Sequence, residues 1–151
     1  MRPEIYVDAD SCPVKQEVVR VAERHSLAVH MVSNQWMRLP NYARMQQQVV
    51  AGGLDQADDW IVLHAGDRDI VITADIPLAA RCLQKGSLVL GPSGRPFDTD
   101  NIGTALAMRD LNAYLRDLGT IKGSGMAFSR QDRSRFLCAL EEAIQTILRR
   151  S

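Results

Sequence analysis

Acidic side chains stand where three separate segments of the chain could bring them together. Asp8 and Asp10 directly follow one apolar segment, Asp75 follows another, and Asp58 lies in the stretch between them. Gathered carboxylates repel one another unless a cation neutralises them, and hard oxygen ligands suit Mg²⁺ or Mn²⁺. Such an ion polarises phosphoryl oxygens and activates water. Any one of these aspartates alone is better explained as a cap of a turn or helix. Taken together, Asp8, Asp10, Asp58 and Asp75 are the candidate metal ligands and catalytic residues.

Arginines supply candidate phosphate-binding groups, because a guanidinium binds phosphate in a bidentate way. Arg109 and Arg116 are seven residues apart and would share one face of a helix, and Arg133 stands near the start of the last expected helix. Arg38 follows Trp36 in a segment that interleaves aromatic and basic residues, a composition that suits single-stranded nucleic acid. Ordinary solvent-exposed arginines, and a Trp36 anchored in the core, are the simpler alternatives.

Cysteine and histidine do not indicate a site of their own. Cys12 lies before an expected helix start, but no histidine has an evident reason to meet it and nearby aspartates oppose a thiolate, so packing in a loop is favoured over catalysis. The three cysteines and three histidines lack the paired spacing of a zinc site. An odd number of cysteines cannot form a closed disulfide framework, which favours a reducing, cytoplasmic location.

The segments that must position these residues alternate between strand and helix patterns. Strands are expected over 4–8, 27–32, 69–73 and 87–90, and residues 45–50 are ambiguous. Helices are expected from Pro13 to about His25, after a cap at Asp55, from Pro77 to Gly86, over 102–118, and after Ser129. This alternation predicts an α/β fold with a mainly parallel central sheet flanked by helices. In such a sheet a ligand site lies beyond the carboxyl ends of the strands, where Asp8 and Asp75 stand.

Length and composition are those of one compact domain spanning 1–151. The chain has 151 residues with 18 basic and 18 acidic side chains. The neutral total hides a division, because residues 1–100 carry a balance of −3 and residues 101–151 a balance of +3. No apolar stretch approaches the ~20 residues that a membrane helix needs, and early acids leave no room for the apolar core of a signal peptide. We expect no membrane partner.

Several motifs together resemble the YaiI/YqxD family of uncharacterised bacterial proteins. They are Val7 to Pro13, Asn34-Gln35, Gly53 to Asp58, Asp69 to Ala79, Arg109-Asp110 and Asp132-Arg133. The family looks like a branch of the PIN-like nuclease superfamily, which implies a PIN-like three-layer fold with acids after the first strand, on a middle helix and after a later strand. The resemblance assigns these places to Asp8, Asp58 and Asp75, with Asp10 as a supplementary ligand and Thr73 beside the third acid.

Three functions follow as hypotheses. The first is a Mg²⁺- or Mn²⁺-dependent phosphodiesterase acting on RNA, with Arg38, Arg109, Arg116 or Arg133 on phosphates. The second is a non-catalytic PIN-like module that binds RNA or protein, because Ile76-Pro77-Leu78 stand where such nucleases often carry a further acid. The third is a haloacid-dehalogenase-like phosphatase, since Asp8-Ala9-Asp10 has the spacing of its nucleophile and acid/base pair, although no cap segment follows and the later motif order differs.

Overall fold

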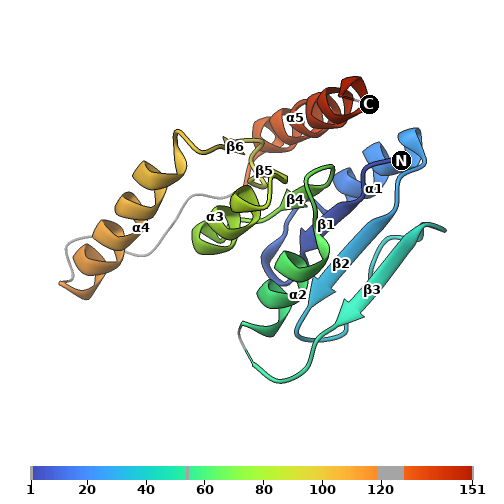
Figure 1. Cartoon of the computed structure of the whole chain (residues 1–151). Helices are drawn as coiled ribbons and strands as arrows, with labels where there is room; N and C mark the ends of the chain where they lie inside the picture. The colour runs from blue at the N-terminus through green and yellow to red at the C-terminus, as the bar shows by residue number, and fades with distance from the viewer. Residues whose placement is uncertain (1, 54, 119–127, 151) are drawn as a thin grey trace.

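The chain folds into a six-stranded sheet with helices on both faces (Figure 1). The computed structural model describes residues 2–53, 55–118 and 128–150. In this part of the chain the elements are β1 (Ile5–Asp8), the short 3-10 turn η1 (Ala9–Ser11), α1 (Lys15–His25), β2 (Val29–Ser33), β3 (Met45–Val49), α2 (Gln56–His64), β4 (Ile70–Ile72), α3 (Ile76–Gln84), β5 (Leu88–Leu90), β6 (Pro96–Phe97), α4 (Ile102–Asp117) and α5 (Arg130–Arg149).

The order of the strands places β1 at the centre of the sheet. The order is β3-β2-β1-β4-β5-β6, with β6 antiparallel to β5 and all other neighbours parallel. From β1 the chain builds outward through β2 and β3, and it then returns to the other side of β1 to build β4 and β5. The carboxyl ends of β1 and β4 therefore flank the point where the strand order reverses, which is where open parallel sheets bind ligands.

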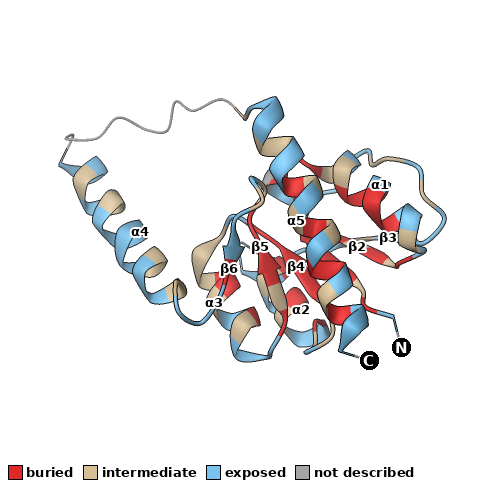
Figure 2. Cartoon of the chain, turned by 90° about the horizontal axis from the view of Figure 1, so that it is seen from above, coloured by how far each residue is buried: buried red, intermediate tan, exposed pale blue. Residues whose placement is uncertain are grey.

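Alternating side chains of the strands divide the core into two halves. Ile5 and Val7 point to the face covered by α1 and α5, whereas Tyr6 points to the face covered by α2 and α3. Each helix buries one apolar face, such as Phe136, Leu140 and Ile144 of α5. The arrangement has three layers, helix on sheet on helix, and Figure 2 shows the buried residues concentrated between these layers. The predicted α/β fold with a mainly parallel sheet is confirmed.

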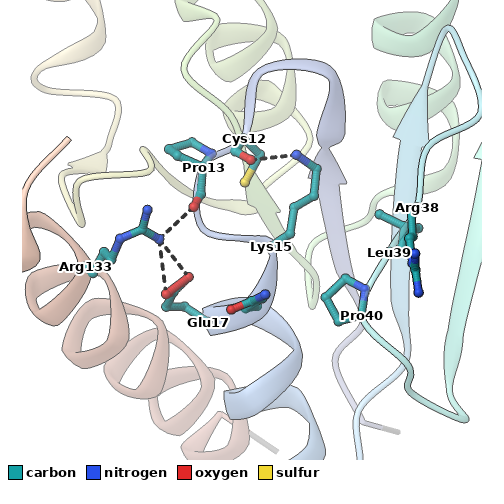
Figure 3. A pocket seen from close by; sticks show the side chains of 9 residues that line it. Cys12, Pro13, Lys15, Glu17, Arg38, Leu39, Pro40 and Arg133 are labelled. Carbon is teal, nitrogen blue, oxygen red and sulfur yellow. Dashed lines mark hydrogen bonds and ion pairs between the residues drawn. The ribbon is translucent and has the colours of Figure 1, made fainter. Parts of the chain in front are cut away.

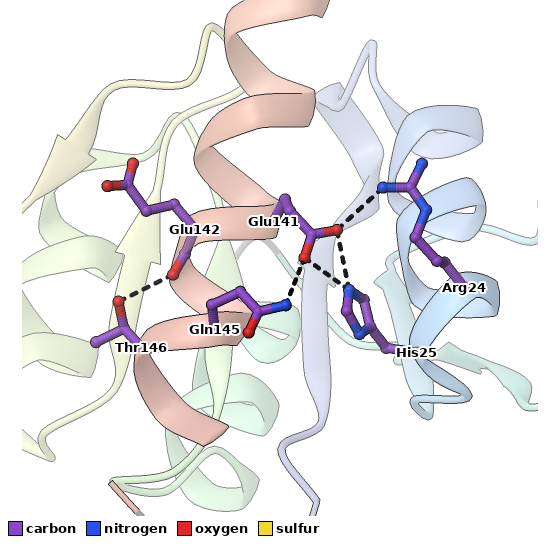
Figure 4. Close-up of polar contacts among 6 residues, drawn as sticks. All are labelled: Arg24, His25, Glu141, Glu142, Gln145 and Thr146. Atoms are coloured by element: carbon purple, nitrogen blue, oxygen red, sulfur yellow. Dashed lines mark hydrogen bonds and ion pairs between the residues drawn. The ribbon is translucent and has the colours of Figure 1, made fainter. Parts of the chain in front are cut away.

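A polar network fixes α5 against α1 across more than a hundred residues of chain. The Glu141 carboxylate accepts a hydrogen bond from Arg24 Nη1 at 3.0 Å and lies 2.8 Å from His25 Nε2 (Figure 4). Gln145 Nε2 donates to the same carboxylate at 3.0 Å, and this bond, together with that of His25, lowers the pKa of Glu141. These contacts hold α5 against α1 on one face of the sheet.

The helix α4 lies apart from the rest of the molecule (Figures 1 and 2). It has no buried residue, and it contacts the body through α3. Large apolar side chains remain exposed along it, namely Met108, Leu111 and Tyr114, with Leu118 just beyond its end. None of the described helices is long and apolar enough to cross a membrane.

Several expected boundaries shift for local reasons. α1 begins at Lys15 and not at Pro13, because η1 and a turn at Pro13 intervene between β1 and the helix. The ambiguous segment 45–50 is the edge strand β3, and the two-residue strand β6 was not expected. The last helix begins directly after Ser129, as expected, and Ser129 and Asp132 form a capping box with hydrogen bonds in both directions. The glycine-containing segment 120–125, which the sequence places between the last two helices, lies outside the described residues.

Candidate functional site

Asp8 and Asp75 are tied together through one buried hydroxyl at the carboxyl ends of β1 and β4. Thr73 Oγ1 donates a hydrogen bond to Asp8 Oδ2 at 2.9 Å and accepts one from the backbone N–H of Asp75 at 2.9 Å. Thr73 is only 2% exposed, so its hydroxyl is fixed by the packing around it. Asp75 Oδ1 also caps α3 by accepting from the Leu78 N–H at 3.1 Å. The capping role expected for an isolated aspartate therefore coexists here with a position beside a second carboxylate.

Asp58 approaches the same place from the first turn of α2. Ala57 and Ile61 are buried against the sheet, which leaves the half-buried Asp58 at the rim of the strand ends. Burial, followed by the charges of Asp75 and Asp8, raises the pKa of Asp58 to about 6. Three acids from three elements, far apart in the sequence, therefore lie near enough to influence the pKa of Asp58.

The environment of Asp8 disfavours an isolated negative charge. Burial raises its pKa, the hydrogen bond from Thr73 lowers it, and the nearby charges of Asp75 and Asp10 raise it again. The net shift is upward, so the folded protein holds this carboxylate at an electrostatic cost. A cation beside Asp8, Asp58 and Asp75 would relieve the cost, and the donor set is the all-oxygen kind that suits Mg²⁺ or Mn²⁺. Among the described residues, however, no three acidic, histidine or cysteine side chains already stand in an arrangement that could hold a metal ion.

Asp10 lies on the other side of β1 and makes a structural contact. Its exposed carboxylate accepts a hydrogen bond from the Asn34 backbone N–H at 3.0 Å. This bond ties η1 to the residue that follows β2. Asp10 therefore influences Asp8 through its charge while fixing the start of the β2–β3 loop.

A cavity of about 440 Å³ opens beside Asp58 and Asp75, and its other charged lining residues are Asp55, Asp59, Arg81 and Arg109. Arg81 forms an ion pair with Asp59 at 2.9 Å. Asp55 stands at the N-cap position of α2 but makes no side-chain capping bond, contrary to expectation. Its charge instead contributes to the raised pKa of Asp58. Asp55 and Arg81 were not among the expected site residues, although Asp55 shares a helix face with Asp58 by its three-residue spacing.

The four candidate phosphate-binding arginines separate into two pairs. Arg109 and Arg116 share a face of α4, as predicted, and both line a second cavity of about 330 Å³. Arg109 also lines the acidic cavity, so it is the one of the four that reaches the carboxylates. Arg38 and Arg133 line a third cavity, of about 730 Å³, at the start of α1 (Figure 3).

Arg133 is partly committed to a structural role. Its Nη1 donates to the Pro13 carbonyl at 2.8 Å and to both carboxylate oxygens of Glu17 at 3.2 and 3.3 Å. The neighbouring Cys12 is buried, and burial raises the pKa of its thiol. A protonated, buried thiol is a packing residue and a poor nucleophile.

Comparison with known proteins relates nearly the whole chain to one group. The model of a family described as the uncharacterised bacterial YaiI/YqxD family matches residues 6–146. A UPF0178 protein of Parvibaculum lavamentivorans is 61% identical over 147 residues, 97% of each chain. A UPF0178 protein of Agrobacterium fabrum is 55% identical, covering 92% of this chain and 91% of its own, and one of Rhodospirillum rubrum is 52% identical, covering 97% and 98%. No solved structure matches.

Proposed function

The chain belongs to the YaiI/YqxD family, whose name states no activity, and we propose that it is a Mg²⁺- or Mn²⁺-dependent phosphodiesterase that cleaves RNA. One observation carries the proposal: Thr73 links Asp8 to Asp75, and Asp58 lines the same cavity as Asp75, at the point where the strand order reverses. The order of the three acids, after β1, on α2 and after β4, also agrees with the resemblance to PIN-like nucleases. A soluble cytoplasmic setting suits three cysteines that are all free.

The residues around the cation would have separate roles in binding the ion, orienting a ligand and binding phosphate. Asp8, Asp58 and Asp75 would hold it, with Asp10 adding negative charge nearby, and the bound ion would supply polarisation of a phosphoryl oxygen and activation of water. Thr73 would orient Asp8 by its hydrogen bond. Arg109, which lines the same cavity, would steady a phosphate. Because the described carboxylates do not form a ready-made ligand group, ion binding must draw the side chains inward.

The direct test is cleavage of end-labelled single-stranded and structured RNA with and without Mg²⁺ or Mn²⁺. Asp8→Asn and Asp75→Asn should each lower the rate by at least about 100-fold, since each removes a ligand charge. Asp67→Asn is the matched control, because Asp67 is exposed and precedes β4, at the opposite end of that strand from Asp75. Cleavage that survives both site substitutions would refute the proposal.

Thr73 offers a sharper test, because it acts through Asp8 and not on the substrate. Thr73→Val removes both of its hydrogen bonds while keeping the side-chain shape, and Thr73→Ser keeps the hydroxyl. Loss of the bond that lowers the pKa of Asp8 should move the pH midpoint of Mn²⁺ binding upward in Thr73→Val and leave it unchanged in Thr73→Ser. Calorimetry at several pH values measures this midpoint. Equal behaviour of the two variants would contradict the assigned role.

A non-catalytic module that binds RNA or protein is the second candidate. It is favoured by the absence, among the described side chains, of three metal-binding groups already in position. Retained RNA binding with no heat of Mg²⁺ or Mn²⁺ binding would identify the module and exclude the nuclease. Hydrolysis of a phosphomonoester, with beryllium fluoride trapped at Asp8, would instead indicate the haloacid-dehalogenase-like phosphatase.

A further inference from the structure

The loop between β2 and β3 displays an aromatic ring from an anchored backbone. Trp36 is 73% exposed, the second most exposed large apolar side chain in the described part of the chain after Leu63. The residues on either side of it are held: the Gln35 carbonyl accepts a hydrogen bond from the fully buried Ser33 hydroxyl at 2.7 Å, and the Met37 N–H donates to Gln47 Oε1 at 2.9 Å. An exposed indole on a fixed backbone is a stacking surface that needs little ordering on binding.

Two residues further on, the loop reaches the cavity at the start of α1, here called the α1 cavity (Figure 3). Its charged lining is Lys15, Arg38, Arg133 and Glu17, three cations against one anion, which leaves a net charge of +2. Glu17 is already paired with Arg133. Arg38 forms no hydrogen bond or ion pair with the residues that the structure describes.

The unused N–H donors that line the α1 cavity can bind an anion. Lys15 uses one N–H for the Cys12 carbonyl at 2.7 Å, and its other two N–H groups are free to bind. Arg133 uses Nη1 for its protein partners. In Figure 3 Arg38 stands across the cavity from Arg133 and Lys15. A volume of about 730 Å³ accommodates a phosphate with its sugar.

The loop and the α1 cavity adjoin the acidic site. The bond from the Asn34 N–H to Asp10 fixes the start of the loop to η1, and η1 directly follows Asp8. The α1 cavity begins at Cys12, four residues after Asp8. A chain of phosphates lying in the α1 cavity would thus continue toward the candidate catalytic carboxylates.

We propose that Trp36 and the α1 cavity bind single-stranded polynucleotide, with one unpaired base stacked on the indole and an adjoining phosphate between Lys15 and Arg38. A duplex buries the faces of its bases against each other, whereas an unpaired base offers a free face to an aromatic side chain. The inference rests on the proposed function for its choice of RNA and narrows the substrate to single strands. It requires no metal ion.

The test separates binding from cleavage. In the Asp8→Asn background with EDTA, intrinsic fluorescence is titrated with a ten-nucleotide single-stranded RNA, the same sequence as duplex, and single-stranded DNA. Trp60→Phe removes the other tryptophan, which stacks on His64, so that the signal reports Trp36 alone. We expect quenching by both single strands and at least ten-fold weaker binding of the duplex. Equal affinity for duplex, or saturation without quenching, would overturn the proposal.

Substitutions assign the contact to the two residues. Binding by these variants is followed through the fluorescence anisotropy of a dye-labelled single-stranded RNA, which needs no tryptophan. Trp36→Ala should weaken single-strand binding by about ten-fold and Trp36→Phe by much less, because stacking is retained. Arg38→Ala should weaken binding and reduce the salt dependence by about one phosphate contact. Arg20→Ala, an exposed arginine elsewhere on α1, is the matched control and should bind as before. Unchanged binding by Trp36→Ala would refute the inference even if RNA is cleaved, whereas Trp36-dependent binding without cleavage would refute the nuclease alone.

Discussion

The charge of Asp58 is unfavourable in the folded protein, so a neutral side chain at this position should stabilise the protein. Burial and the neighbouring carboxylates raise its pKa to about 6, whereas an unfolded chain titrates it near 3.8. Between these values the folded state binds the proton more tightly, so stability falls as the pH rises from about 4 to 6. After discounting for partial exposure, we expect Asp58→Asn to raise the free energy of unfolding by about 1 kcal/mol at pH 7.5.

Urea denaturation at pH 7.5 and at pH 4 measures this effect. The gain should vanish at pH 4, because the carboxyl group is then protonated in the folded state and its charge no longer matters. Asp59→Asn is the control. The Asp59 carboxylate forms an ion pair with Arg81, so its removal should not raise the free energy of unfolding. An equal gain at both pH values would show that the charge of Asp58 is not the cause.

At the residue scale, the proximity of two of the acids can be predicted from the sequence, whereas the partners of the residues around them cannot. Asp8 and Asp75 could be predicted because the ends of parallel strands meet at one edge of a sheet. The contribution of Asp55 could not, because it depends on how α2 packs against the sheet. Arg133 looked like a free phosphate ligand, yet it pairs with Glu17, which is 116 residues away in the sequence and is brought near by the packing of α5 on α1.

The turn between β5 and β6 depends on one glycine that touches α5. Gly94 has a φ of +88°, and a Cβ atom there would lie 2.6 Å from the Arg135 carbonyl carbon and 2.8 Å from the Phe136 nitrogen. Both the backbone conformation and the close approach of α5 therefore exclude a side chain. Gly94→Ala should lower the free energy of unfolding by roughly 2–4 kcal/mol. Denaturation in urea measures the loss.

Gly103 is the matched control, because it lies in the first turn of α4 and a Cβ there would meet no atom within 4 Å. Gly103→Ala should leave the stability unchanged or raise it by up to about 0.5–1 kcal/mol through helix propensity. A Gly94→Ala protein as stable as the Gly103→Ala protein would mean that the β5–β6 turn does not rest on α5.

At the scale of elements, the central strands could be predicted because they are buried, whereas the strands at the edges of the sheet could not. The apolar segments of β1 and β4 are buried on both sides, so their patterns are strong. β3 is an edge strand with three glutamines and no buried residue, which explains why its pattern was ambiguous. β6 has two residues and begins with proline, so it carries no periodicity to detect. Tertiary pairing alone defines these two strands.

Charge is distributed over the whole molecule in a way that the neutral total conceals. The acids gather around the ends of β1 and β4 and the first turn of α2. The cations of the α1 cavity lie on the β2 side of β1, and those of α4 lie beyond β4. A polynucleotide that crosses the strand ends would therefore meet positive charge on either side of an acidic centre. Because the charges are separated in this way, a net charge near zero does not argue against a nucleic-acid partner.

The sheet and four of its helices should unfold as one domain, while α4 should open separately. The two halves of the core share the strands β1 and β4, so neither half can lose its packing without exposing the other. α4 has no buried residue and should open at little cost. Native-state hydrogen exchange in low urea should show amides of β1, β4 and α5 exchanging only with global unfolding, and those of α4 at least about 1,000-fold faster. Separate transitions for the α1–α5 and α2–α3 sides would contradict a single domain, and protection of α4 equal to that of α5 would show that its apolar side chains are covered in solution.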